Sequence, residues 1–275
     1  KTLIALGVEP SYVMGHSAGE YVAATLAGVY SEKDAVRLLA ERSRIIGGSP
    51  QGGMLFVPMG CEALQPRLPE DVSIGVVIGP DGCVASGAVQ GIERLEALLR
   101  AENISFLRIQ ADRAGHSPLL ESAMPRLRKA FEGVTLRRPS IPILSNVTGT
   151  WLSDTEATDP GYWVRQMREP VRLSGQLFEL CNTGNAILLE VGPSRKLSAM
   201  LRRHPALKGR HPIVPTMPAE QASGKETAAL LEGLGRLWQE GGKADWKKVD
   251  FLNGSGRTVA LPTYPFERQR FWLDH

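Results

Sequence analysis

The stretch Tyr12-Val13-Met14-Gly15-His16-Ser17-Ala18-Gly19-Glu20 decides how the rest of this 275-residue chain is interpreted. Its apolar beginning predicts a short buried strand, and residues 20–29 predict a helix directly after it. Gly-x-Ser-x-Gly between a strand and a helix is the pattern of a nucleophile elbow, a sharp turn that projects a serine hydroxyl clear of the sheet. The two glycines let neighbouring backbone approach the turn, and the helix N-terminus supplies free N–H groups and a positive dipole end. The same letters also occur by chance in glycine-rich loops, but the flanking elements favour Ser17 as a nucleophile.

The composition is that of an ordinary globular protein, with 43% hydrophobic and 22% charged residues. The net charge of +3 is small and the basic residues are scattered, so we expect no nucleic-acid partner. The three cysteines, Cys61, Cys83 and Cys181, are far apart and give neither a disulfide framework nor a metal site, which suits a reducing cytoplasm. No apolar run is long enough for a membrane span and no signal peptide is present, so we expect a cytoplasmic chain without a membrane partner.

The first seven residues resemble the last turns of a helix whose end is marked by Gly7. A chain that opens inside a helix, and without methionine, is expected to be a piece of a longer protein.

Strands alternate with helical patterns through the first fifty residues, which predicts an α/β core with a mostly parallel sheet. From Met54 to Ile109 the order changes to strand, helix, strand, strand, helix, strand, the ferredoxin-like pattern. We therefore expect residues 53–110 to form a small inserted subdomain, and residues 1–52 and 111–242 to form the larger core.

Several local signals predict how the elements of the larger core begin and end. Ser31 is expected to cap the helix that follows it, with Asp34 completing a capping box. Pro125 and Pro170 each predict a break in a helical pattern. A buried strand is expected over residues 186–191, and an irregular chain after residue 241.

Arg42 falls on the apolar stripe of the helix predicted over residues 31–46. A buried guanidinium is unfavourable unless an anion meets it. The alternative is an arginine whose stem packs while its head reaches solvent near the end of the helix. Periodicity alone leaves both interpretations open.

A serine nucleophile needs a base within hydrogen-bonding distance, and five histidines are available: His16, His116, His204, His211 and His275. His16 is adjacent to the serine and should leave the turn in another direction. His204 and His211 lie in a basic stretch that looks solvated, and His275 is terminal. Elimination favours His116, although a structural histidine at a helix start is the alternative. No carboxylate clearly completes a triad, because nothing in the pattern aims the nearby Asp112.

With these residues placed, the chain resembles the acyltransferase domains of modular type I polyketide synthases, in the malonyl-CoA:acyl-carrier-protein transacylase family. The resemblance covers essentially the whole chain. The motifs that carry it are Gly15-His16-Ser17-Ala18-Gly19-Glu20, Glu41-Arg42, Gly115-His116-Ser117-Pro118, Ser145-Asn146-Val147-Thr148-Gly149, Tyr162-Trp163, Pro170-Val171-Arg172, Glu190-Val191-Gly192-Pro193, and Leu261-Pro262-Thr263-Tyr264-Pro265-Phe266 with Arg268 and Trp272.

The resemblance implies an α/β-hydrolase-like large subdomain with an inserted ferredoxin-like small subdomain, followed by a post-acyltransferase linker over residues 243–275. It implies Ser17 as nucleophile and His116 as general base, oriented by the backbone carbonyl of Gln166 in place of a carboxylate. The N–H of Ala18 would serve the oxyanion hole. Arg42 would bind the free carboxylate of a malonyl-type acyl group, since a planar guanidinium suits that pairing.

The same resemblance implies the other components of the reaction. His16 and Gly115 are expected at the substrate site. The substrates would be malonyl-CoA or methylmalonyl-CoA and the phosphopantetheine thiol of an acyl carrier protein, with no tightly bound cofactor. An adjoining ketosynthase and the N-terminal part of the domain would be further partners.

Two departures from the family pattern affect these expectations. The family's N-terminal segment, whose Gly-Gln-Gly-x-Gln loop supplies an oxyanion N–H, is absent, so we expect the chain alone to be incomplete. Residues 113–116 are Arg-Ala-Gly-His, where malonyl-type domains have His-Ala-Phe-His and methylmalonyl-type domains have Tyr-Ala-Ser-His. Ala18 and residues 20–24 favour malonyl, whereas Gly115 leaves space for a branch. We expect a malonyl preference with some tolerance.

Two other functions compete with acyl transfer. One is a serine hydrolase or editing thioesterase that uses the same elbow, and the other is an inactive structural fragment of a synthase. Arg42 argues against a simple esterase, which needs no carboxylate-binding cation on a buried helix face.

Overall fold

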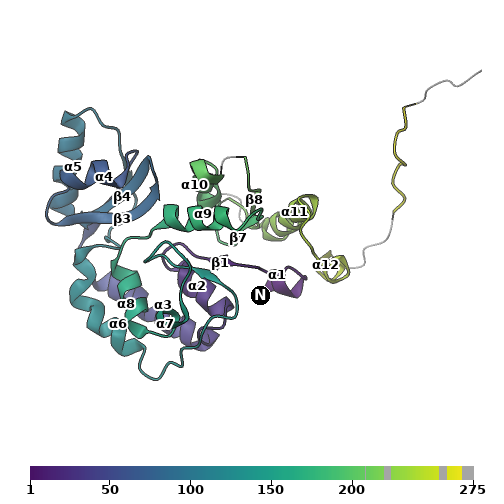
Figure 1. The fold of residues 1–275 in the computed structure, drawn as a ribbon, viewed down its shortest axis with the longest axis horizontal. Helices are drawn as coiled ribbons and strands as arrows, with labels where there is room; N and C mark the ends of the chain where they lie inside the picture. Colours follow the sequence, from purple (N-terminus) through teal and green to yellow (C-terminus); the bar gives the residue numbers. More distant parts are fainter. Residues whose placement is uncertain (208, 220–223, 254–258, 268–275) are drawn as a thin grey trace, which may run out of the picture. The chain divides into compact units, whose positions relative to one another are not determined.

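The computed structural model describes residues 1–207, 209–219, 224–253 and 259–267 (Figure 1). The chain divides into two compact units. The larger is Pro10–Gly241, and the smaller combines Lys1–Glu9 with the residues from Gly242 onwards. Every residue of the candidate site lies in the larger unit.

The smaller unit contains two short helices, α1 (Thr2–Ala5) and α12 (Trp246–Asn253). The chain leaves α1 through Leu6 and then Gly7 at φ +83°, so the predicted helix end is confirmed. Leu6 carbonyl accepts a hydrogen bond of 2.7 Å from the N–H of Asp245.

Helix α12 lies where an irregular chain is predicted, so that expectation is wrong for residues 246–253. The motif 261–266 has no regular structure and its side chains are exposed. Arg268 and Trp272, which belong to the same motif, lie outside the described residues.

The elbow stretch forms strand β1 (Val13–Met14), which pairs in parallel with β6 (Ile143–Leu144) and leads into helix α2 (Gly19–Leu26). Strand β1 is half-buried rather than buried. A second parallel pair consists of β7 (Leu188–Glu190) and β8 (Ile213–Pro215). The expected parallel pairing is therefore present, as two separate pairs among the described residues. The strand predicted over 186–191 is shorter and half-buried, and Val191 beyond it is 70% exposed.

Three aromatic rings form the centre of the core beside the elbow. Tyr21 from α2 and Trp163 from α8 (Pro160–Arg168) are fully buried, with ring centroids 5.3 Å apart, and Tyr30 lies 5.5 Å from the same Trp163 ring. Burial of rings of this size dominates core energetics. Around them pack α3 (Glu32–Gly48) and α6 (Met124–Ala130). Because Tyr21 and Ser17 are four residues apart, this aromatic cluster anchors the helix that carries the elbow.

Proline interrupts the helices at the predicted places. Pro118–Ala123 forms a 3₁₀ turn, η2, and α6 begins directly after it with Pro125 in its first turn. Pro170 lies between α8 and α9 (Leu173–Asn182). The remaining helical segments of the larger unit outside residues 52–109 are α7 (Asp154–Ala157), α10 (Lys196–Leu201), η3 (Pro205–Leu207) and α11 (Glu226–Gln239).

The small subdomain has the predicted ferredoxin-like order. Its elements are β2 (Gly52–Val57), α4 (Cys61–Leu64), η1 (Gln65–Arg67), β3 (Val72–Gly79), β4 (Gly82–Ala88), α5 (Val89–Ala101) and β5 (Leu107–Ile109). The strands form an antiparallel sheet in the order β3-β4-β2-β5, and α4 and α5 pack on one face of it (Figure 1).

The opposite face of this sheet packs against the start of α9. Val76 and Val84 share a cluster with Val171 and Leu177. The backbone of Val171 hydrogen-bonds on both sides to β3, donating to Gly75 carbonyl at 2.9 Å and accepting from Val77 N–H at 2.8 Å. The small subdomain is thereby joined to the core by backbone hydrogen bonds as well as by apolar burial.

His204 and His211 are buried, so the expectation that their stretch is solvated is wrong. His204 Nε2 lies 3.1 Å from Ser174 Oγ, and its ring contacts Phe178 at 5.4 Å. His211 Nδ1 lies 3.2 Å from the backbone of Ala186. The arginines around these histidines in the sequence suggested exposure to solvent. Tertiary packing instead buries both imidazole rings and gives each a contact from another part of the chain.

Ser31 caps α3 as predicted, since its Oγ accepts a hydrogen bond of 3.1 Å from the N–H of Asp34. The side chain of Asp34 accepts from the Ser31 hydroxyl at 2.6 Å, instead of the backbone N–H that a full capping box would use. We predict that Ser31→Ala lowers the free energy of unfolding by about 1 kcal/mol, because an N–H of the first turn loses its acceptor. Ser31→Asn restores an acceptor without placing a second carboxylate beside Asp34, and should stay close to wild type in the same urea titration. Equal losses for both variants would contradict the capping role.

Candidate active site

The elbow places Ser17 in left-handed backbone geometry, with φ at +54°. Such a conformation is uncommon for a residue other than glycine and persists only where its surroundings enforce it. The two glycines of the motif differ in why they are needed. A Cβ at Gly15 would collide with the backbone of Gly19 and Glu20, whereas a Cβ at Gly19 would meet no atom within 4 Å. Only Gly15 is therefore required by close backbone approach.

Both peptide groups of Ser17 are held by side chains from elsewhere in the fold. The N–H of Ser17 donates to Asn146 Oδ1 at 2.8 Å, and its carbonyl accepts from Gln166 Nε2 at 2.7 Å. Asn146 also donates from Nδ2 to Gly15 carbonyl at 2.6 Å. The Ser145–Gly149 motif contained Asn146, but no spacing in the sequence indicated that it holds the elbow.

Ser17 and His116 form a close pair, with Oγ 2.7 Å from Nε2. The Nδ1 atom of His116 lies 2.8 Å from the carbonyl oxygen of Glu169. A carbonyl can only accept, so Nδ1 carries the proton and Nε2 is free to accept the Ser17 hydroxyl proton. The structure therefore brings together the two residues that the sequence proposed, in the tautomer that a general base requires.

The hydrogen bond of His116 Nδ1 goes to the carbonyl of Glu169, where that of Gln166 is expected. The carbonyl of Gln166 also acts on the ring, since both carbonyls raise the pKa of His116 and that of Glu169 has the larger effect. Glu169 directly follows the last residue of α8, where carbonyls lack a partner within the helix. The side chain of Gln166 contributes instead through the Ser17 carbonyl.

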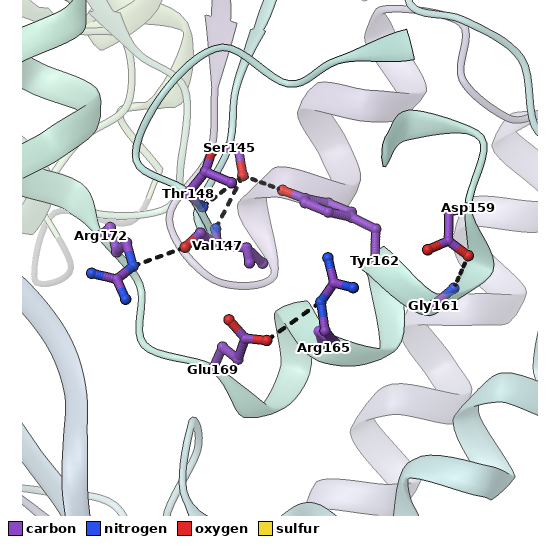
Figure 2. A network of polar contacts seen from close by, with 9 residues as sticks. All are labelled: Ser145, Val147, Thr148, Asp159, Gly161, Tyr162, Arg165, Glu169 and Arg172. Carbon is purple, nitrogen blue, oxygen red and sulfur yellow. Dashed lines mark hydrogen bonds and ion pairs between the residues drawn. The ribbon is translucent and has the colours of Figure 1, made fainter. Parts of the chain in front are cut away.

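The end of α8 that carries Glu169 is fixed from two sides (Figure 2). Glu169 N–H donates to Arg165 carbonyl at 2.7 Å, and the two side chains form an ion pair of 3.4 Å. On the following turn, Arg172 Nε donates to Val147 carbonyl at 2.9 Å. These contacts connect the carbonyl that orients His116 to the loop that carries Asn146.

His116 is 3% exposed, and its φ of +57° is also left-handed. Burial lowers the pKa of His116 to about 3, and the nearby Arg42 cation acts in the same direction. His116 is therefore neutral, and able to accept a proton, across the physiological pH range.

Arg42 is 6% exposed on α3, so the buried interpretation of its position is confirmed. Its Nη2 donates to Ser17 Oγ at 3.1 Å, and its guanidinium lies 5.8 Å from the centre of the Tyr21 ring. Its Nε has no hydrogen-bond partner among the described residues, and no described carboxylate forms an ion pair with it. Burial lowers the pKa of Arg42. The site thus holds a desolvated cation with unused donor capacity.

A cavity of about 630 Å³ opens beside Ser17 and His116. Its polar part includes His16, whose buried Nδ1 has no partner among the described residues and whose pKa is lowered by burial. Gly115 lines the cavity, and a Cβ there would meet nothing within 4 Å. The apolar wall comes mainly from the face of the small sheet that also packs against α9. Its residues are Ile46, Met54, Val76, Ile78, Val84, Ile109, Ala111 and Met200.

The loop before His116 is tied to the small subdomain. Ser86 in β4 donates from its hydroxyl to Gly115 carbonyl at 2.6 Å. Ser117, on the other side of the histidine, donates to Ala114 carbonyl at 2.7 Å. Ala18, the expected oxyanion residue, follows Ser17 at the start of α2, and among the described residues its N–H donates no hydrogen bond.

In the described part of the chain, no group of three or more His, Cys, Asp or Glu side chains is arranged to hold a metal ion. No helix in those residues combines the length and the hydropathy of a membrane span.

The family model described as "Acyl transferase domain" matches residues 1–233. The chain belongs to this acyltransferase family. A phenolphthiocerol/phthiocerol polyketide synthase of Mycobacterium tuberculosis is 34% identical over 276 residues, which cover 100% of this acyltransferase chain and 18% of the synthase. Polyketide synthase GfsA of Streptomyces halstedii is 36% identical, over 97% of the chain and 4% of that protein. The acyltransferase chain thus spans a small part of the curated relatives it matches.

Solved acyltransferase domains have the same fold. The acyl transferase domain of ZmaA superposes with a TM-score of 0.85 at 33% identity, covering 95% of this chain and 61% of that one. The acyl transferase domain of SpnD, solved with 2-(pent-4-yn-1-yl)malonyl, gives a TM-score of 0.81 at 36% identity, over 87% of this chain and 58% of that one.

The two glycines of the elbow provide a matched pair of variants. Gly15→Ala should reduce labelling of Ser17 by a fluorophosphonate by about 100-fold or prevent folding, because the added carbon collides with backbone that cannot move aside. Gly19→Ala adds the same carbon in open space and should be labelled at a rate within about threefold of wild type. Circular dichroism of both proteins separates misfolding from a displaced serine. Equal behaviour of the two variants would contradict the steric argument.

Proposed function

We propose that this acyltransferase domain moves a malonyl-type acyl group from coenzyme A to Ser17, and then to the phosphopantetheine thiol of an acyl carrier protein. The observation that supports it most directly is the convergence on one oxygen. Ser17 Oγ lies 2.7 Å from a neutral, correctly oriented histidine and 3.1 Å from a buried guanidinium without a carboxylate partner among the described residues. The relatives that match the chain are polyketide synthases, which supports the carrier protein and a neighbouring ketosynthase as partners in the cytoplasm.

In the first half-reaction, Ser17 Oγ attacks the thioester carbonyl while its proton passes to His116 Nε2. The C–S bond breaks, and the coenzyme A sulfur leaves with the proton returned by His116. The Ala18 N–H, at the positive end of α2, would stabilise the oxyanion formed between these steps. In the second half-reaction, the carrier thiol gives its proton to His116 and attacks the acyl-Ser17 ester, and Ser17 regains its proton.

The charge of Arg42 affects the basicity of His116, and the acyl group bound to Arg42 would change that effect. As a cation beside His116 it lowers the pKa of that residue. A carboxylate bound to the guanidinium would cancel much of this field, so His116 would accept the Ser17 proton more readily. A malonyl-type group would then promote its own transfer, whereas an acetyl group would leave the field unchanged.

A serine hydrolase or editing thioesterase would also use the serine and histidine, and an inactive structural fragment would use neither. The buried Arg42, whose Nε has no partner in the described part of the chain, favours the transferase, because ester hydrolysis does not need a carboxylate-binding cation at the nucleophile. Intact mass after mixing with malonyl-CoA distinguishes the three. A stable adduct on Ser17, absent in Ser17→Ala and greatly slowed in His116→Ala, is expected. Free malonate without an adduct on Ser17 would indicate a hydrolase. If neither the adduct nor free malonate forms, the chain is an inactive fragment.

Removing the guanidinium should change substrate preference and not only activity. Arg42→Ala should slow malonyl transfer by about 10- to 100-fold, because a charge-assisted hydrogen-bonded pair is lost, while acetyl transfer is kept or gained. Acylation rates with malonyl-CoA and acetyl-CoA test this. Arg42→Lys keeps the charge without the bidentate geometry, so its malonyl rate should be intermediate. Equal losses for malonyl and acetyl would show that Arg42 is structural.

The position before His116 should set the tolerance for branched acyl groups. The domain should prefer malonyl-CoA over methylmalonyl-CoA with some tolerance, and the open space at Gly115 supports that tolerance. The branched malonyl group in the SpnD domain shows that a 36% identical relative admits such a branch.

Gly115→Phe should disfavour methylmalonyl-CoA by about tenfold, since one methyl group in a pocket is worth roughly 1–3 kcal/mol. Competition between the two thioesters, read as the mass of the adduct, measures the ratio. Gly115→Ala adds only the first carbon in open space and should leave it nearly unchanged. An excess of methylmalonyl adduct in wild type would overturn the malonyl preference.

A further inference from the structure

Glu20, the last residue of the elbow motif, has a buried carboxyl group that the transfer reaction does not use. It lies in the first turn of α2 and is 0% exposed. Its Oε1 accepts the N–H of Asn146 at 3.0 Å and the hydroxyl of Tyr162. Its Oε2 is buried and has no partner among the described residues. One oxygen is fully satisfied and the other is not.

A chain of hydrogen bonds with fixed direction leads to Glu20 Oε1, and Figure 2 shows its first part, from Val147 and Thr148 through Ser145 to Tyr162. Ser145 Oγ accepts the N–H groups of Val147 and Thr148, each at 3.1 Å. The Ser145 hydroxyl proton therefore points to Tyr162 Oη at 2.7 Å, and the Tyr162 proton points to Glu20. Since every donor in this chain ends on Oε1, a proton carried by the carboxyl group would sit on Oε2.

The neighbouring amide of Gln166 can adopt only one orientation. Its Nε2 donates to Ser17 carbonyl, so a flip would place two oxygens against each other. The other end of the amide, Oε1, is buried without a donor among the described residues. The side chains of Gln166 and Glu20 lie close enough to interact, and an amide N–H directed at the carboxyl would lower the pKa of Glu20. Gln166 Oε1 and Glu20 Oε2 are both buried acceptors without a donor among the described residues, and a proton on Glu20 Oε2 would supply one.

We propose that Glu20 is a neutral carboxylic acid whose Oε2–H donates to Gln166 Oε1, and that this bond fixes the amide that holds the carbonyl of Ser17. Glu20 is then a positioning residue for the nucleophile. The inference rests on Ser17 being the nucleophile of the proposed function, but not on the identity of the acyl donor.

The electrostatics favour a protonated Glu20 below about pH 7. Burial raises the pKa of Glu20 to about 7, against the hydrogen bonds of Tyr162, Asn146 and Gln166 and the charge of Arg42 on α3. The lowering by Gln166 applies to an amide that donates to the carboxyl, whereas its Nε2 is directed at the carbonyl of Ser17. The other titratable groups that face it are Tyr21 and Tyr30, whose pKa values are themselves raised by burial, so both remain neutral. None of these groups is a second anion that would compete for the proton, and Arg42 is the cation that limits the rise.

Ionisation of Glu20 should therefore loosen the elbow. Without the Oε2 proton, Gln166 Oε1 faces a buried carboxylate, and its amide holds the strained Ser17 carbonyl less well. His116 does not mask this effect, because its pKa of about 3 keeps it in the basic form throughout the range in which Glu20 titrates. A change in serine reactivity near neutral pH then reports on Glu20.

The test is the rate of Ser17 labelling by a fluorophosphonate, which needs no acyl-CoA, measured from about pH 6 to about pH 9. In Glu20→Gln the amide can donate to Gln166 Oε1 at every pH. Its labelling rate should match wild type at about pH 6 and exceed it by about tenfold at about pH 8, one unit above the wild-type pKa of about 7. Glu20→Ala should be slow throughout. Glu96→Gln, which alters a buried carboxylate in α5 of the small subdomain, should follow wild type.

Stability gives an independent measurement. A carboxyl whose folded-state pKa is raised stabilises the fold below its unfolded value of 4.5, and this contribution is lost as pH rises to about 7. The melting temperature of wild type should therefore fall relative to Glu20→Gln between these values, and the difference should stay constant above them.

Parallel pH profiles for wild type and Glu20→Gln, or a Glu20→Gln protein as slow as Glu20→Ala, would overturn the proposal. The second variant, Gln166→Ala, should lose the pH dependence of Ser17 labelling. If that pH dependence is unchanged, the proposal is overturned. A wild-type protein that is labelled but does not take malonyl from coenzyme A would contradict the proposed substrate and leave this inference standing. A wild-type serine inert to both reagents would overturn the nucleophile and the inference together.

Discussion

The site depends on keeping Ser17 in a backbone conformation that its side chain disfavours. A left-handed φ of +54° is maintained because the N–H and the carbonyl of the same residue are bound by Asn146 and Gln166. These side chains come from the loop after β6 and from α8, more than a hundred residues along the chain. The strain of the elbow is thus balanced by long-range hydrogen bonds, which explains why the conformation of Ser17 needs the whole core and not only the local turn.

His116, whose ring contacts Ser17, is also held in a disfavoured backbone conformation. It too is left-handed, and its ring is oriented by a carbonyl left free at the end of a helix. Such a carbonyl orients the imidazole without adding an anion, so the base is neutral beside Arg42 instead of being drawn into an ion pair. A carboxylate at that position would compete for the guanidinium with any anion that enters the cavity. The arrangement therefore leaves Arg42 available for the malonyl-type carboxylate of the proposed function.

Local and periodic features were predictable from the sequence. The strand–turn–helix around Ser17, the buried face that carries Arg42 and the ferredoxin-like order of the small subdomain all depend on nearby residues. Features that depend on backbone atoms or on distant packing were not. The hydrogen bond of His116 Nδ1 goes to the carbonyl of Glu169, about one helical turn beyond the expected Gln166, whose carbonyl has the smaller effect on the ring. No side chain marks which carbonyl is used. Asn146 and Glu20 were part of recognised motifs, yet their roles emerge only when α2, α8 and the loop after β6 meet. His204 was misjudged for the same reason.

The hydrogen bond from Ser86 to the carbonyl of Gly115 has a consequence for recombining synthases. It means that the inserted sheet supports the loop that carries His116 as well as forming much of the apolar wall of the cavity. Exchanging residues 53–110 between domains as a cassette, in order to change the accepted acyl group, also exchanges a support of His116. Chimeras that keep a serine at position 86 and the backbone pairing of β3 with Val171 would change the accepted acyl group without changing the support of His116. In chimeras that lose either contact, a change in substrate choice could not be distinguished from a loss of turnover.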